Sequence, residues 1–255
     1  MMRKVIAILL LGVFGAAMIP VETSLDKLQR SARLRQITLN LSLRNKIGQN
    51  GYIAALSGFR APLAAYLYLE AYSAWQKLQW GKMAGLFDTI TTLQPRSLMY
   101  WDMASWHMAW NASVWALDDV KGQPSEALRI RNQQQYIKMG KDILERGIEN
   151  NPESYALQMA LANLLQQKLE DHCGAGEAYL KASELPGAPP FAARFAGYEL
   201  AKCPHHEREA YDLLKKLYDK GPDERKGSLI TTLKELEKKL DVPPADRIPS
   251  ADPSH

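Results

Sequence analysis

The stretch AYDLLKKLYDKGP (residues 210–222) has a spacing that recurs in MAGLFDTITTLQP (83–95), GKDILERGIENNP (140–152) and AGEAYLKASELP (175–186). In each stretch the first residue is followed by packing residues four and seven positions later, and a proline ends the stretch. Offsets of four and seven fall on one stripe of a helix, and proline interrupts helical hydrogen bonding. The four stretches therefore predict four helices of one kind, which indicates a helical repeat array.

The residues that follow each proline test this interpretation, because they should begin the first helix of the next pair. Apolar and small residues recur there at helical spacing: Trp101, Ala104, Ser105 and Met108 after Pro95; Gln158, Leu161, Ala162 and Leu165 after Pro152; Ala193, Ala196, Gly197 and Leu200 after Pro186. The interval between the first two prolines is roughly twenty residues longer than the others, which predicts an insertion around 117–135. We therefore expect an all-α array of antiparallel helix pairs over 60–241, closed by a capping helix at 228–240.

The pattern resembles the tetratricopeptide repeat (TPR), whose first helix carries Trp-x-x-Leu-Gly-x-x-Tyr and whose second carries Ala-x-x-x-Phe-x-x-Ala before a closing proline. The resemblance implies a TPR-like, right-handed array. A second resemblance is carried by AALSGFR (54–60), Trp75, LF (86–87), LQPR (93–96), YW (100–101) and WHMAWN (106–111). These residues are similar to those of a group of uncharacterised, membrane-anchored bacterial proteins with TPR-like helices. This second resemblance covers about 35–220 and implies a helical body at a bacterial membrane.

The first 21 residues have the pattern of an export signal. Fifteen apolar residues at 5–19 follow Arg3 and Lys4 and end at Pro20. Counted to Val21, the segment has seventeen residues and is just long enough to span a bilayer, so we expect a signal anchor that holds the body on the periplasmic side of the inner membrane. Cleavage after Ala17, which would leave a soluble periplasmic protein, and a core helix are the alternatives. Basic residues between 27 and 35 lie within the window that the positive-inside rule counts, so they leave the orientation less determined.

Residues 22–59 form a basic arm that contains an alternating segment. From 37 to 43, apolar side chains take every second position, which is typical of a strand. Its partner could be 52–56, another chain's sheet edge, or a groove of the array in which the arm lies extended. Residues 242–255 hold four prolines among polar residues, and we expect this tail to be disordered.

The charge distribution argues against nucleic acid as a partner. The net charge is +4, of which residues 22–60 contribute +5 and Arg3 and Lys4 contribute +2, so the remainder carries about −3. An array that binds nucleic acid would need a basic stripe along its body.

No arrangement of residues in the sequence is typical of an active site. Phosphate-binding glycine loops, nucleophile elbows and His-Glu-x-x-His helices are all missing from the sequence. His107 lies in an apolar helix, where a core histidine is the simpler interpretation. Asp118 and Asp119 fall in the expected insertion, which we interpret as a loop, and are more simply read as solvated than as catalytic. We therefore expect a protein without catalysis, cofactor or metal.

The most suggestive feature for function is a second stripe on the first helices, rotated by one residue from the packing stripe. In a superhelical array this stripe lines the inner face. The stripe predicts these partner-binding residues: Tyr68, Tyr72, Trp75, Asp102, Trp106, Trp110, Asn163, Gln166, Arg194 and Tyr198. Tryptophan, tyrosine and arginine are common anchors at interfaces, so the stripe favours a scaffold that binds a peptide or helix of another envelope protein. A glycan-binding module that uses the tryptophan cluster is the alternative, and an enzyme comes third.

Two cysteines lie in the later repeats, where we expect Cys173 and Cys203 each to fall between the two helices of its pair. In an exported protein this arrangement favours a disulfide. A zinc site formed with His172, His205 or His206, and free thiols, remain as alternatives.

Overall fold

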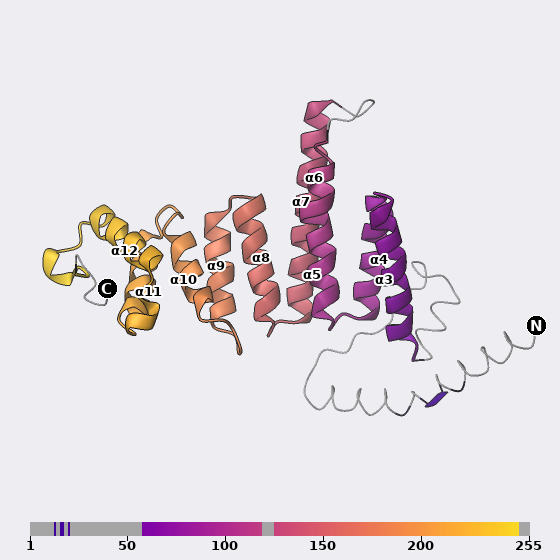
Figure 1. Cartoon of the computed structure of the whole chain (residues 1–255), viewed down its shortest axis with the longest axis horizontal. Helices are drawn as coiled ribbons and strands as arrows, with labels where there is room; N and C mark the ends of the chain where they lie inside the picture. The colour runs from indigo at the N-terminus through magenta and orange to yellow at the C-terminus, as the bar shows by residue number, and fades with distance from the viewer. Residues whose placement is uncertain (1–12, 14–15, 18–19, 21–57, 119–124, 250–255) are drawn as a thin grey trace, which may run out of the picture. The chain divides into compact units, whose positions relative to one another are not determined.

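The computed structural model describes residues 58–118 and 125–249, together with 13, 16, 17 and 20, and Figure 1 shows their arrangement. Between 58 and 249 every regular element of the described residues is helical, which confirms the all-α prediction for this part of the chain. The α-helices are α3 (Arg60–Gln76), α4 (Trp80–Leu93), α5 (Leu98–Trp106), α6 (Ser113–Trp115), α7 (Glu126–Asn150), α8 (Tyr155–Lys168), α9 (His172–Ser183), α10 (Phe191–Leu200), α11 (Glu207–Tyr218) and α12 (Gly227–Lys239). A π-helix, η1 (His107–Ala112), joins α5 to α6, and two 3-10 turns are η2 (Pro222–Glu224) and η3 (Pro244–Asp246).

The chain divides into two compact units, Met1–Ala104 and Ser105–His255, and the division falls within α5. In the first unit α3 and α4 pack as a helical hairpin. Helix α4 buries large side chains, including Phe87 and Ile90, whereas the fully buried positions of α3 are the small residues Ala64, Ala71 and Ala74. Alanines let the two helix backbones approach closely, so α4 supplies most of the side-chain volume of this core.

The second unit is a row of helical hairpins, in which η1 packs on α7, α8 on α9 and α10 on α11 (Figure 1). The packing positions that define the repeated spacing are all buried, in both units: Met83, Phe87, Ile90, Gly140, Leu144, Gly147, Ala175, Tyr179, Ala182, Ala210, Leu214 and Leu217. Helices α4, α7, α9 and α11 each end two to four residues before the proline of their stretch. The spacing thus marks both the buried stripe and the end of each second helix.

The predicted insertion has a different form from the one expected. Residues 126–135 belong to α7 and extend it to 25 residues, so much of the insertion is helix rather than loop. The segment EALRIRNQQQ contains no glycine or proline and is rich in residues with good helix propensity, which explains the extension. In Figure 1 the end of the hairpin formed by α6 and α7 projects beyond α8.

The C-terminal segment also differs from the expectation of disorder, over residues 242–249. Val242 and Ile248 are buried in the core formed with α11 and α12. The backbone nitrogen of Ile248 donates to Glu237 Oε1 at 2.6 Å, and Lys234 donates to the carbonyl of Ile248. The prolines prevent a helix here, but the side chains of Val242 and Ile248 and the buried carboxylate of Glu237 still hold the segment in place. The amino-acid composition of the segment does not indicate these contacts.

Several predictions concern residues outside the described part of the chain. They are the anchor at 1–21, of which only 13, 16, 17 and 20 are described, and the basic arm with its segments at 37–43 and 52–56. Among the described residues, no helix has the length and apolar character needed to cross a membrane.

Candidate functional site

Three side-chain contacts link helices along one side of the second unit. They join η1, α8 and α10, each the first helix of its hairpin, and they join α10 to α12. Lys168 of α8 lies 5.6 Å from the ring centre of Trp110 in η1, and Gln166 donates to Glu199 of α10 at 2.8 Å. Tyr198 of α10 hydrogen-bonds to Ser228 of α12 at 2.8 Å. We call this side the first-helix face; it consists of Trp106, Trp110, Asn163, Gln166, Lys168, Phe191, Phe195, Tyr198 and Glu199.

One end of the first-helix face is aromatic and includes part of the π-helix. Trp106 is 44% exposed, whereas Trp110 is half-buried beneath Lys168. A π-helical turn adds a residue to the helix and is frequent at functional sites. Burial lowers the pKa of Lys168, and its ammonium group stays within cation–π range of Trp110. This end therefore offers one open indole beside a cation held on a second indole.

His107 lies behind the indole of Trp106, with their ring centres 5.0 Å apart. It is buried, and its Nδ1 is 3.0 Å from the amide nitrogen of Asn111. Burial lowers the pKa of His107 to about 4, so the ring is neutral at pH 7. A base with this pKa is poorly matched to proton transfer at neutral pH, and the ring instead supports the position of Trp106.

The neutral state of His107 predicts how stability depends on pH. The unfolded chain takes up the proton near pH 6.5 and the folded chain only near pH 4, so stability is complete above pH 6.5 and falls as the pH drops towards 4. We expect a loss on the order of 1–3 kcal/mol across this window, measured by urea unfolding at several pH values. His107→Asn should flatten the dependence. An unaltered slope in His107→Asn would exclude His107 as its source.

The middle of the face is a hydrogen-bonded network around Glu199, which is only 2% exposed. His172 Nδ1 donates to Glu199 Oε2 at 2.6 Å, and Lys202 and Gln166 each donate to Oε1 at 2.8 Å. Burial alone raises the pKa of Glu199, but the hydrogen bonds from Lys202 and His172 outweigh it and hold the pKa below its ordinary value. The carboxylate is therefore ionised and joins α8, α9 and α10.

Two residues predicted to bind a partner belong to this network. Tyr179 donates to Asn163 Oδ1 at 2.6 Å and lies 3.5 Å from Gln166 Oε1. Burial, with repulsion from Glu199, raises the pKa of Tyr179 to about 12, so the phenol keeps its proton and remains a donor. Asn163 and Gln166 thus have partners within the chain, and their first role is to hold the helices in register.

The far end of the face is aromatic again. Phe195 contacts Tyr179 and Phe191 at ring-centre distances of 5.5 and 5.3 Å, and Tyr198 at 6.2 Å. Phe191 and Phe195 are both more than one-third exposed, and neither is among the predicted partner-binding residues. Aromatic residues at offsets of four and seven, as in FAARFAGY, are the signal that would have found them. Arg194, which was predicted to bind, instead forms an ion pair with Glu224.

The remaining predicted residues lie in the first unit. Tyr68 packs against Phe87 and Tyr100, so it belongs to the core rather than to an open surface. Tyr72 is exposed and its ring centre is 5.4 Å from that of Trp75, and Asp102 is exposed on α5. Only part of the predicted stripe is therefore accessible.

Cys173 and Cys203 form a disulfide, with their Cα atoms 4.9 Å apart. Cys173 lies in the first turn of α9 rather than in a loop, and Cys203 lies in the turn after α10. Asp171 caps α9 by accepting from the backbone nitrogen of Gly174 at 2.9 Å, so the helix begins early enough to include Cys173. In this bonded form neither sulfur is a thiolate that could ligate zinc.

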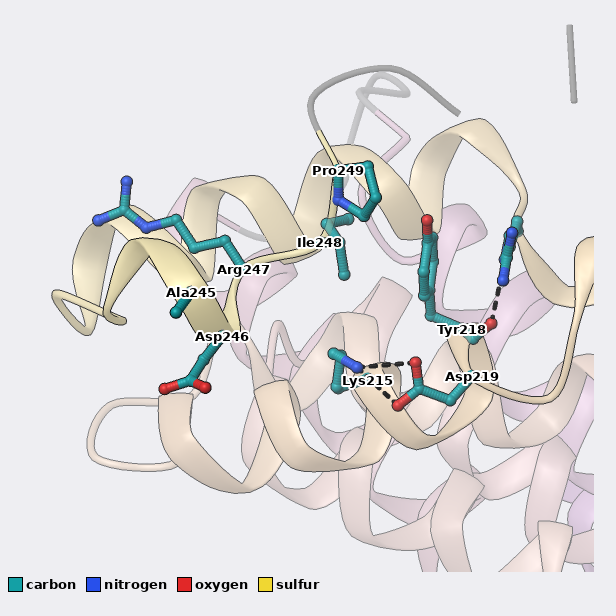
Figure 2. A pocket seen from close by; sticks show the side chains of 9 residues that line it. Lys215, Tyr218, Asp219, Ala245, Asp246, Arg247, Ile248 and Pro249 are labelled. Atoms are coloured by element: carbon teal, nitrogen blue, oxygen red, sulfur yellow. Dashed lines mark hydrogen bonds and ion pairs between the residues drawn. The ribbon is translucent and has the colours of Figure 1, made fainter. Parts of the chain in front are cut away.

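A cavity of about 470 Å³ lies at the C-terminal end of the second unit, between α11 and the segment that ends at Pro249. Lys215 Nζ donates to both carboxylate oxygens of Asp219, four residues later, at 2.7 and 2.6 Å (dashed lines in Figure 2). Arg225 lies 4.5 Å from the ring centre of Tyr218. Lys215 and Asp219 thus pair with each other, and Arg225 lies against Tyr218, so the cavity is a weaker candidate than the first-helix face.

Other candidate chemistry is limited in the described residues. Asp118 is exposed, and Asp119 lies outside the part that the structure describes. Between 58 and 118 and between 125 and 249, no three His, Cys, Asp or Glu side chains gather closely enough to hold a metal ion.

Comparison of the chain with protein-family models, with curated proteins and with solved structures finds no match.

Proposed function

We propose that the protein is a non-catalytic interaction scaffold of the bacterial cell envelope, in which a TPR-like array binds a peptide or helix of another protein. The first-helix face is the inner face of this array. The observation that carries the proposal is the exposed indole of Trp106 beside the pair formed by Trp110 and Lys168. Exposed aromatic rings held by a rigid surface are typical anchors for a partner chain.

The distribution of polar groups supports a peptide or helix as the ligand. The central carboxylate and amides already form hydrogen bonds within the chain, so binding needs little reorganisation there. The open aromatic groups lie at the two ends, around Trp106 and around Phe195. An amphipathic helix or extended peptide that places one apolar residue at each end fits this arrangement.

Glycan binding is the rival proposal, because indole rings stack on sugars. Trp80 and Trp101 are buried in the first unit, and Trp106 is the most open indole among the described tryptophans. Two of the six tryptophans are therefore core residues and three more are half-buried, which makes an extended sugar platform less suitable than a peptide site. An enzyme of unknown type ranks third.

The proposal places the body outside the cytoplasm, attached through residues 1–21. The support for this location is the apolar run behind Arg3 and Lys4. Protease added to spheroplasts should degrade the body, and full protection would place it in the cytoplasm.

Affinity capture from native membranes tests the binding proposal. The wild-type chain and the Leu128→Ala variant, which changes an exposed residue of α7, should recover the same protein. Trp106→Ala should recover much less of it. Equal recovery with Trp106→Ala, or saturable binding to a glycan panel that this change abolishes, would reverse the ranking of the two functions.

A further inference from the structure

Helix α3 carries an apolar stripe on its exposed side, opposite its packed alanines. The stripe consists of Pro62, Ala65, Tyr66, Leu69 and Tyr72, which lie at helical spacing. Tyr66 is 59% exposed and Leu69 is 67% exposed. A helix that is apolar on all sides is normally buried, so this stripe lacks the cover that its composition predicts.

Helix α12, the last α-helix of the described residues, shows what an exposed terminal helix normally looks like. Helix α12 buries Leu229, Leu233 and Leu236 and presents Glu235, Lys238 and Lys239 to solvent. Terminal elements of repeat arrays need such a polar outer side for solubility. In α3 the only charged residues are Arg60 and Glu70, and neither belongs to the stripe.

We propose that residues 37–43 of the same chain, ITLNLSL, cover this stripe and cap the N-terminal end of the helical body. The segment has apolar residues at every second position, so in an extended conformation one of its sides is wholly apolar. The six steps from Ile37 to Leu43 span about 20 Å. The ten steps from Pro62 to Tyr72 span about 15 Å, so the segment can cover the whole stripe.

The residues between 43 and α3 are numerous enough for 37–43 to reach the exposed side of α3. Residues 44–57 can extend to about 46 Å, whereas the 17 residues of α3 span about 26 Å. The segment can therefore pass along α3 from either end.

Charge and covalent linkage favour residues 37–43 as the cover of the stripe over a membrane surface and over a second copy of the chain. Neither the stripe nor ITLNLSL contains a charged residue, so their contact desolvates no charge. A helix that lies on a membrane surface usually carries many Lys and Arg on its polar side, and α3 has one Arg. A second copy competes at its bulk concentration, whereas the chain's own segment has an effective concentration of about millimolar.

Photo-cross-linking of the full-length protein in membranes tests the proposal. Benzoylphenylalanine replaces Tyr66, and light and heavy isotope-labelled chains are mixed before irradiation. The cross-links should map to 37–43 and join residues of the same label. Cross-links to the other label, to lipid or to another part of the chain would overturn the proposal.

Two neighbouring substitutions sharpen the test. Leu41→Asp should lower the cross-link yield about fivefold or more, because an unpaired charge on the apolar side is strongly disfavoured in a contact. Asn40→Asp places the same charge on the other side of the segment and should leave the yield unchanged. An equal loss in both variants would contradict the proposed alternation. Circular dichroism of both variants should match the wild type, because the substitutions leave the sequence of the described helices between 58 and 249 unchanged.

Discussion

Replacing Cys173 and Cys203 together by alanine lowers the free energy of unfolding by about 3–4 kcal/mol, the loss expected when a loop of this length is no longer closed in the unfolded chain. The two residues are 30 positions apart, and the bond ties the start of α9 to the turn after α10. Urea unfolding, monitored by circular dichroism, measures the change. Hydrogen bonds of Glu199 join the same helices, so we expect the variant to fold while losing stability.

The disulfide prediction has an internal control. Reductant should destabilise the wild type by a similar amount and have no effect on the double alanine variant. Protein purified without reductant should show no alkylated thiol by intact mass. Two alkylated thiols, or a wild type that is insensitive to reductant, would contradict the bond.

The second large effect is expected at Gly140, which lies where α7 touches η1. A Cβ atom there would be 2.6 Å from the Ala109 Cβ and 3.0 Å from the backbone oxygen of Ser105. Backbone atoms of a helix cannot turn aside, so the two helices must separate. Gly140→Ala should therefore lower the free energy of unfolding by about 1–3 kcal/mol, despite the better helix propensity of alanine.

Gly85 is the matched control, because it is also helical but no atom beyond its chain neighbours and its own helix backbone lies within 4 Å of the added Cβ. Gly85→Ala should raise stability by about 0.5–1 kcal/mol, through helix propensity alone. The two changes are chemically identical, but they should shift the free energy of unfolding in opposite directions, which thermal or urea unfolding measures. Equal stabilisation by both would show that α7 and η1 do not approach closely.

The fold was predictable because the repeated spacing is local. Residues four and seven apart lie on one stripe whatever surrounds the helix, and a proline ends the helix without help from other parts of the chain. The burial of Phe87, Tyr179 and Leu214 follows from that local pattern. The C-terminal segment escaped prediction because Val242 and Ile248 are held by Glu237 and Lys234, contacts that composition does not encode.

The candidate site was predictable only in part. The expected stripe, rotated by one residue from the buried one, contains the exposed Trp106, but Trp110 in the same stripe is half-buried beneath Lys168. Arg194 and Gln166 lie on expected helices, but their partners Glu224 and Glu199 are 30 and 33 residues away in the sequence. Helix periodicity cannot reveal such pairs, because they depend on how different helices come together.

The most direct test of partner binding at the first-helix face is calorimetric titration of the purified body with the captured partner. Trp106→Ala should raise the Kd about 30-fold or more, which corresponds to the loss of roughly 2 kcal/mol expected for an anchoring tryptophan. Leu128→Ala should leave the Kd within about twofold, as expected for an exposed residue outside the interface. An unchanged Kd in Trp106→Ala would contradict binding at this face.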